Sequence, residues 1–134
     1  MDLLPFIDIV EDLNRELTPR QRYQRMIETL QRSYGERGSS CDVIALLKLE
    51  GDALRLVAVV GLKREALARR FKIEQHPRLE TILQNRGVTR FEADSPFPDP
   101  YDGLVADGRE QLHVHDCMGS TIHIDDKPWG VITF

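Results

Sequence analysis

The sequence predicts an α+β fold in which helices pack on an antiparallel β-sheet. Three observations lead to this prediction. Apolar residues recur every three or four positions near the amino end, they alternate every second position further on, and the alternating stretches are joined by tight turns. Helices grouped beside hairpin-linked strands favour this class over an alternating parallel α/β fold. The 134 residues fit one domain, which we take as residues 1–134.

The first predicted helix covers residues 3–17. Its apolar stripe consists of Leu3, Phe6, Ile7, Val10, Leu13 and Leu17. Leu4 and Ile9 lie beside this stripe and give the helix more apolar surface than one packing face needs. We therefore expect the helix to form part of a homodimer interface.

A second helix is predicted to begin at Thr18. Thr18 and Gln21 have the spacing of a capping box, and Pro19 suits the first helical position. Gly35 is a typical residue to end it. The stripe of this helix contains Tyr23, Met26, Ile27, Leu30 and Tyr34.

Strands with short helices between them follow. The predicted strands are residues 42–49, 54–60, 88–91, 112–117, 118–124 and 129–134, and the predicted helices are residues 63–70 and 76–86. The sequence stops at Phe134 inside an apolar strand. We expect a fragment of a longer protein, truncated at its last strand, with an exposed strand edge that assists dimerisation.

Charge and composition exclude several classes of protein. The net charge of −4 argues against a nucleic-acid binder, which would carry a clustered basic surplus. The longest uncharged apolar stretch, residues 57–62, is far too short to span a membrane. Cys41 and Cys117 are too few for a disulfide framework and are expected to be reduced, as in the cytoplasm. Cys41 is expected to serve in packing.

A long segment between Phe91 and Leu112 lacks periodicity, and long loops of this kind are often functional. It contains Asp99-Pro100-Tyr101-Asp102, in which proline stands at the second position of a predicted β-turn. The turn would hold two carboxylates side by side, and a cation between them would relieve their repulsion. Half of a metal site and an ordinary solvated turn both fit this spacing.

A second candidate metal site lies in the stretch from Leu112 to Cys117. Side chains alternate along a strand, so His113, His115 and Cys117 would share one face. Imidazole and thiolate together suit zinc, copper or iron. The alternative is a buried cysteine in the core beside two ordinary strand histidines. His123 has no local partner.

No sequence feature identifies an enzyme. The chain has neither a phosphate-binding glycine loop, nor a nucleophile elbow, nor a dinucleotide-binding glycine set, and we expect no enzymatic activity. Arg78 follows His76-Pro77 at a predicted helix start. Taken alone, it indicates a solvated helix residue or a bidentate partner of a carboxylate.

Several motifs occur together in order. They are His76-Pro77-Arg78-Leu79-Glu80, Ala93-Asp94-Ser95, Pro98-Asp99-Pro100-Tyr101-Asp102-Gly103-Leu104 and Val114-His115-Asp116-Cys117-Met118-Gly119. The chain resembles, over nearly its whole length, the amino-terminal GAF domain of the nitric-oxide-responsive regulators of anaerobic nitric oxide reductase. These NorR-type proteins are sigma-54-dependent transcription activators.

The resemblance implies a sensor domain with a mononuclear non-haem Fe(II) cofactor. Carried over by motif, the metal-site residues are Asp99, Asp102 and Cys117, with Arg78 as a ligand or as a neighbour of the ligands. A guanidinium lacks a free lone pair, which favours the neighbour role. The family's further aspartate would directly follow Phe134, where this chain ends. Nitric oxide binding would relieve repression of an adjacent ATPase domain, and this domain would bind neither nucleic acid nor membrane.

One alternative function belongs to another class. Other GAF domains are dimerisation modules that bind a small organic ligand without a metal, and the pocket would then lie between the sheet and the loop after Phe91.

Overall fold

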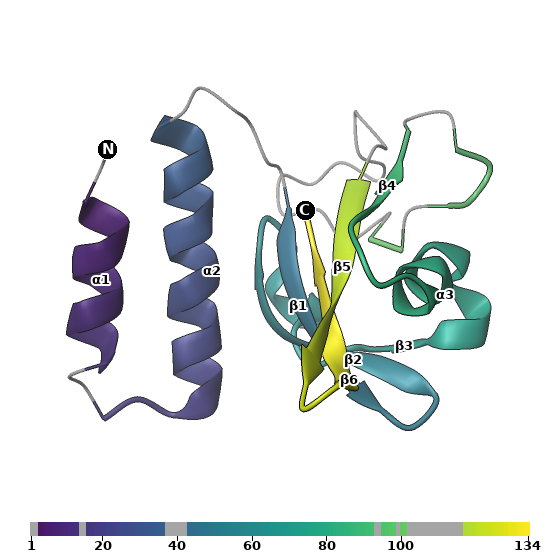
Figure 1. Cartoon of the computed structure of the whole chain (residues 1–134), viewed down its shortest axis with the longest axis horizontal. Helices are drawn as coiled ribbons and strands as arrows, with labels where there is room; N and C mark the ends of the chain where they lie inside the picture. Colours follow the sequence, from purple (N-terminus) through teal and green to yellow (C-terminus); the bar gives the residue numbers. More distant parts are fainter. Residues whose placement is uncertain (1–2, 14–15, 37–42, 93–94, 99, 102–116) are drawn as a thin grey trace.

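A computed structural model of the chain describes residues 3–13, 16–36, 43–92, 95–98, 100–101 and 117–134 (Figure 1). Within these residues the elements are α1 (Leu4–Leu13), α2 (Pro19–Glu36), β1 (Ile44–Glu50), β2 (Ala53–Val60), η1 (Arg64–Ala66), β3 (Arg70–Lys72), η2 (Ile73–Gln75), α3 (Pro77–Gln84), β4 (Thr89–Phe91), β5 (Cys117–Ile124) and β6 (Lys127–Thr133). The predicted α+β class is confirmed.

The strands form one six-stranded sheet in the order β3-β2-β1-β6-β5-β4, with antiparallel neighbours throughout. β6, the last strand of the chain, pairs with β1 on one side and β5 on the other. Phe134 continues this pairing by exchanging backbone hydrogen bonds with Met118. The expectation of an exposed terminal strand edge was wrong, because β6 lies in the centre of the sheet.

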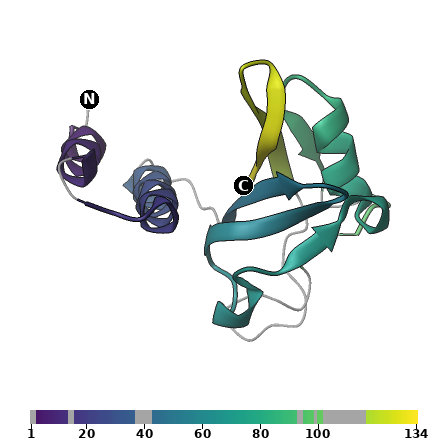
Figure 2. The same cartoon turned by 90° about the horizontal axis from the view of Figure 1, so that it is seen from below.

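The two faces of the sheet are covered by different helices. α2 packs on one face and α3 on the other, and α1 lies against the side of α2 that faces away from the sheet (Figures 1 and 2). The core under α2 is built on Ile27, Ile44, Leu46, Val57 and Ala58. The larger core on the α3 side includes Phe71, Leu79, Ile82, Phe91 and Tyr101.

The amino-terminal helices follow the predicted capping but not the predicted packing. Thr18 and Gln21 form the capping box, with backbone-to-side-chain hydrogen bonds of 2.9 and 3.2 Å. α2 does not end at Gly35 but continues to Glu36. α1 is shorter than predicted. Four side chains of the predicted apolar stripe are exposed instead of packed on the chain, namely Leu3, Phe6, Ile7 and Val10, whereas Leu17, beyond the end of α1, is half-buried.

The segment predicted as a helix over residues 63–70 is also different. It forms the single 3-10 turn η1 and then enters the short strand β3, which pairs with the start of β2. Ala68 has a φ of 71°, which is incompatible with a continuing helix. Its N–H donates to the carbonyl of Leu56 at 2.9 Å, so the chain turns here to join the sheet.

Among the helices that the structure describes, none has the length and apolar character needed to cross a membrane.

Candidate metal site

Arg78 is the largest fully buried side chain that the structure describes, and it starts the site. Pro77 occupies the first turn of α3, where its missing N–H costs nothing, so Arg78 lies one residue further into the helix. Arg78 and Ile82 are four residues apart and share one helix face. This face is turned to the core, and Arg78 is only 1% exposed. The interpretation of Arg78 as a solvated helix residue was therefore wrong.

The guanidinium of Arg78 connects three elements. Its Nε donates to the carbonyl oxygen of Phe97 at 2.9 Å, and its Nη1 donates to Sγ of Cys117 at 3.3 Å. Its Cζ lies 5.2 Å from the centroid of the Phe91 ring, within cation–π range. The buried cation thus joins α3 to the proline-rich loop, to β4 and to β5.

Cys117 opens β5 directly opposite Phe91 of β4. It is half-buried, and its thiol is not in a disulfide. A guanidinium donor at hydrogen-bond distance stabilises negative charge on sulfur, and the thiolate is the form that ligates a metal. Cys117 also packs against the core on the α3 side, so a metal ligand and a core cysteine both fit these surroundings.

Tyr101 anchors the proline-rich loop. Pro100 and Tyr101 lie in a turn, as the position of Pro100 predicted. The Tyr101 ring is buried edge-on against Phe71, with centroids 5.8 Å apart, and its hydroxyl hydrogen-bonds Oγ1 of Thr133 in β6 at 2.8 Å. Tyr101, one of the two residues between the candidate aspartates, is thus fixed to β6 in the middle of the sheet.

His76 precedes α3 and borders the same core. Its ring meets Phe71 edge-on at 5.1 Å. Burial, and secondarily the nearby positive charge of Arg69, lower the pKa of His76 below its ordinary value of 6.5. Both effects favour the neutral form of the imidazole.

The remaining predicted residues divide into two groups. Asp99, Asp102, His113, His115 and Cys41 lie outside the residues that the structure describes. Of the predicted site residues, only Arg78 and Cys117 are described, and the structure brings them together. His123 is exposed on β5. The described stretches of the chain contain no cluster of three metal-binding side chains.

Sequence reasoning missed the supporting residues of this site. Phe97 contributes through its backbone carbonyl, for which a sequence carries no signal. Tyr101 carried such a signal, since a large aromatic residue beside a proline in a turn between two aspartates is a candidate for burial. The burial of Arg78 was also detectable, because its spacing to Ile82 places it on the apolar face of α3.

The fold defines a class of protein. A GAF domain of a phosphoenolpyruvate-protein phosphotransferase from Coxiella burnetii matches with a TM-score of 0.70 and 16% identity, covering 98% of this chain and 74% of that one. The A. aeolicus nlh2 GAF domain matches with a TM-score of 0.66 and 19% identity, covering 97% and 78%. The chain has the GAF fold.

The sequence relatives are more specific. The nitric oxide reductase transcription regulators NorR1 and NorR2 of Cupriavidus necator are 46% and 47% identical to this chain over 94% of its length. The anaerobic nitric oxide reductase transcription regulator NorR of Vibrio vulnificus is 41% identical over 96%. The chain spans about a quarter of the length of these relatives. No family model matches.

The resemblance found in the sequence is thereby confirmed. The chain is a GAF-fold homologue of one part of the NorR nitric oxide reductase transcription regulators.

Proposed function

We propose that this chain is the nitric-oxide-sensing domain of a cytoplasmic, sigma-54-dependent transcription activator, and that it binds nitric oxide at a mononuclear non-haem iron. The observation that carries the proposal is the contact between buried Arg78 and Cys117 beside the anchored loop. The sequence relatives in Cupriavidus necator and Vibrio vulnificus are nitric oxide reductase transcription regulators, which supports nitric oxide as the ligand. In this proposal the domain is not an enzyme and represses an adjacent ATPase domain until nitric oxide binds.

Two features of the described residues support a metal of this kind. A thiol at hydrogen-bond distance from a buried cation is a suitable soft donor, and Tyr101 holds the turn that carries two carboxylates in the sequence. We assign Cys117, Asp99 and Asp102 as the residues that would hold Fe(II). Bound there, the ion would supply an open position and electron density suited to nitric oxide, a π-acid.

Arg78 has a different role in this proposal. Its guanidinium has no lone pair for a metal, and its Nε and Nη1 are engaged with Phe97 and Cys117. It would orient the thiolate and balance its charge, and it would transmit a change at the sulfur to the Phe97 loop. Loss of such an orienting contact typically lowers metal affinity by about 10–100-fold.

We also propose that the domain works as a homodimer through the residue 3–17 helix. Large apolar side chains on α1 are exposed, and exposed patches of this type mark interaction surfaces.

Metal analysis after anaerobic loading with ferrous iron tests the proposed site. We expect stoichiometric iron and a nitric-oxide-dependent electron paramagnetic resonance signal, both abolished by Cys117→Ala and retained in Cys41→Ala. Arg78→Lys should retain the signal at a reduced iron affinity. The loading is repeated in the longer regulator to which we assign the chain.

Three outcomes would contradict the assignment. Iron and nitric oxide binding that survive Cys117→Ala would remove the cysteine from the site. Zinc that resists exchange by iron would favour the group His113, His115 and Cys117. A metal-free protein holding a tightly bound organic molecule would favour the alternative GAF function.

A further inference from the structure

α3 is a short helix whose position depends on the sheet behind it. It has eight residues, and so short a helix is not stable by itself in water. Its contacts with the rest of the domain therefore decide where it lies. This position matters for the candidate metal site, because α3 carries Arg78, whose guanidinium donates to Sγ of Cys117.

α3 contacts β5 at three positions on one face of the strand. Cys117, Gly119 and Thr121 are two residues apart along β5, so they lie on the same side of the sheet. Arg78 contacts Cys117. Ile82 lies over Gly119, where an added Cβ atom would be 2.6 Å from Cδ1 of Ile82. Oγ1 of Thr121 donates to the backbone carbonyl of Ile82 at 2.9 Å.

The spacing of these contacts agrees on the two elements. Arg78 and Ile82 are four residues apart, which is about 6 Å along a helix, and Cys117 and Gly119 are about 6.6 Å apart along a strand. A shift of α3 that disturbs the contact at Ile82 therefore also disturbs the contact at Arg78. Functional side chains must be held within about 0.5 Å of their working geometry by the packing and hydrogen bonds around them.

The hydrogen bond from Thr121 is the directional contact in the last turn of α3. Backbone carbonyls in the last turn of a helix lack a partner within the helix itself. The carbonyl of Ile82 accepts from the N–H of Asn85 at 3.2 Å and from the hydroxyl of Thr121 at 2.9 Å. Apolar packing of Ile82 on Gly119 is non-directional, whereas a hydrogen bond weakens steeply when its geometry changes. The Thr121 hydroxyl therefore sets where α3 lies along β5.

We propose that Thr121 is a positioning residue of the candidate metal site, a role that rests on the proposed iron-binding function and deepens it. Its hydroxyl fixes α3 along β5 and thereby holds the guanidinium of Arg78 at the sulfur of Cys117. Thr121 is four positions from Cys117 in the sequence and acts on the site through α3.

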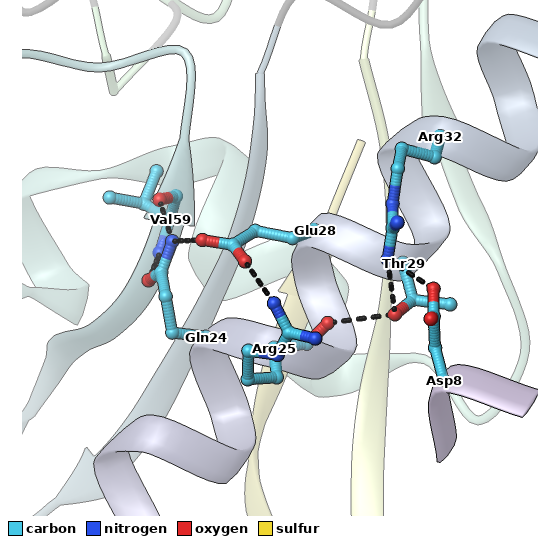
Figure 3. Close-up of polar contacts among 7 residues, drawn as sticks. All are labelled: Asp8, Gln24, Arg25, Glu28, Thr29, Arg32 and Val59. Atoms are coloured by element: carbon cyan, nitrogen blue, oxygen red, sulfur yellow. Dashed lines mark hydrogen bonds and ion pairs between the residues drawn. The ribbon is translucent and has the colours of Figure 1, made fainter. Parts of the chain in front are cut away.

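Thr29 in α2 offers a matched control on the other face of the sheet. It is 7% exposed, against 6% for Thr121, and its hydroxyl also donates to a backbone carbonyl at 2.9 Å (Figure 3). The acceptor is Arg25 in the same helix. Thr29→Val and Thr121→Val thus remove similar buried bonds, of which the first lies within α2 and the second joins α3 to β5.

Hydrogen exchange of the Arg78 guanidinium, followed by NMR on the metal-free chain, tests the positioning without iron. The guanidinium is buried and bonded to Phe97 and Cys117, so its protons should exchange slowly. Thr121→Val should speed this exchange about tenfold or more. Thr121→Ser, which keeps the hydroxyl, and Thr29→Val should both exchange at the wild-type rate.

Three exchange results would overturn the proposal. The rate in Thr121→Val could equal that of the wild type, which would leave Thr121 a purely structural residue. The rate could rise equally in Thr29→Val, which would make general loss of stability the cause. Thr121→Ser could lose protection as Thr121→Val does, and then the hydroxyl would not be responsible.

Anaerobic loading of the same variants with ferrous iron tests the consequence for the site. Thr121→Val should bind iron about tenfold more weakly or worse, as expected when a metal ligand loses its orienting contact. Thr121→Ser and Thr29→Val should bind iron as the wild type does. Faster Arg78 exchange with unchanged iron affinity would overturn the role of Thr121 at the metal site. A wild type that binds no iron, while Arg78 exchange still depends on the Thr121 hydroxyl, would refute the sensing function and leave the positioning of Arg78 supported.

Discussion

At the scale of single residues, the two faces of the sheet differ in what they bury. In α2, the buried polar side chain that the structure describes is that of Thr29, which donates to a carbonyl of its own helix. On the α3 side, buried polar side chains are hydrogen-bonded to defined partners, as in Arg78 to Phe97, Thr121 to the carbonyl of Ile82, and Tyr101 to Thr133. A buried polar group lowers stability unless it is hydrogen-bonded, so a network of such groups favours the one side-chain arrangement in which every group has a partner. The α3 side is therefore the one suited to a specific site.

The bond between Tyr101 and Thr133 gives the first prediction. Tyr101→Phe leaves the buried Thr133 hydroxyl without this partner, and the free energy of unfolding should fall by about 1–3 kcal/mol. Thr133→Val should have a similar effect. The double variant should cost clearly less than the sum, because neither partner is left alone. Urea unfolding of the wild type, the two single variants and the double variant measures this double-mutant cycle. Strictly additive losses of stability would show that the bond contributes nothing.

At the scale of elements, periodicity predicted α2 and the β1–β2 hairpin correctly and found α1 but placed its end too late. The three-residue strand β3 was missed because so short a segment carries no period. The outward face of α1 was also missed. An apolar stripe shows which side of a helix avoids water, but it does not say whether the chain itself or another molecule covers that side.

Gln24 makes the backbone hydrogen bonds at the edge of β2 that a neighbouring strand would otherwise make. β3 pairs with β2 only from Ala53 to Arg55, and further along the strand Gln24 bonds both the N–H and the carbonyl of Val59, at 3.1 and 2.9 Å. Gln24→Leu should lower the free energy of unfolding by about 1–3 kcal/mol, because it leaves the N–H and the carbonyl of Val59 without their hydrogen-bond partner.

Hydrogen exchange gives the specific readout of this clamp. The Val59 amide should exchange faster in Gln24→Leu. Gln31→Leu, an exposed change on the same helix, should leave both the exchange rate and stability within about 0.5 kcal/mol of wild type. Unchanged protection of Val59 in Gln24→Leu would contradict the role given to the side chain.

The junction between η2 and α3 makes stability depend on pH through His76. Its pKa is lower in the folded protein than in the unfolded chain, so the unfolded chain binds more protons as the pH falls. The contribution of the neutral imidazole is complete above its ordinary value of 6.5 and is lost as the pH falls through the folded pKa. In His76→Phe, which keeps a ring against Phe71, this part of the acid destabilisation should disappear. Thermal unfolding of both proteins between neutral pH and pH 5 measures this. If the melting temperature of His76→Phe fell with pH as steeply as that of the wild type, His76 would not be responsible.

At the scale of the whole molecule, the sequence predicted the class of fold and the resemblance but not the strand order. Hairpin signals identify neighbours along the chain, whereas the pairing of β6 with β1 joins segments far apart in sequence. The same limit applies to the site, where the sequence pointed to residues but not to the contact between them. Motifs singled out Cys117 and Arg78, but the bond between them arises only because α3 crosses the face behind β5.

The central position of β6 makes one small residue decisive for the whole sheet. Among the strands that the structure describes, β6 joins the β3-β2-β1 half of the sheet to the β5-β4 half. At Gly130 the strands approach so closely that a Cβ atom would lie 2.0 Å from the carbonyl oxygen of Leu47. Because the obstacle is backbone, Gly130→Ala must displace β6 from β1.

We expect Gly130→Ala to lower the free energy of unfolding by about 3 kcal/mol or more and to weaken the cooperativity between the two halves of the sheet. Gly119→Ala should cost less, because the atom met there at 2.6 Å is the end of the flexible Ile82 side chain. Gly87→Ala, with nothing within 4 Å of the added atom, should stay within about 0.5 kcal/mol of wild type. Urea unfolding followed by circular dichroism ranks the three variants. A Gly130→Ala protein as stable as the Gly87→Ala protein would mean that β6 does not hold the two halves together.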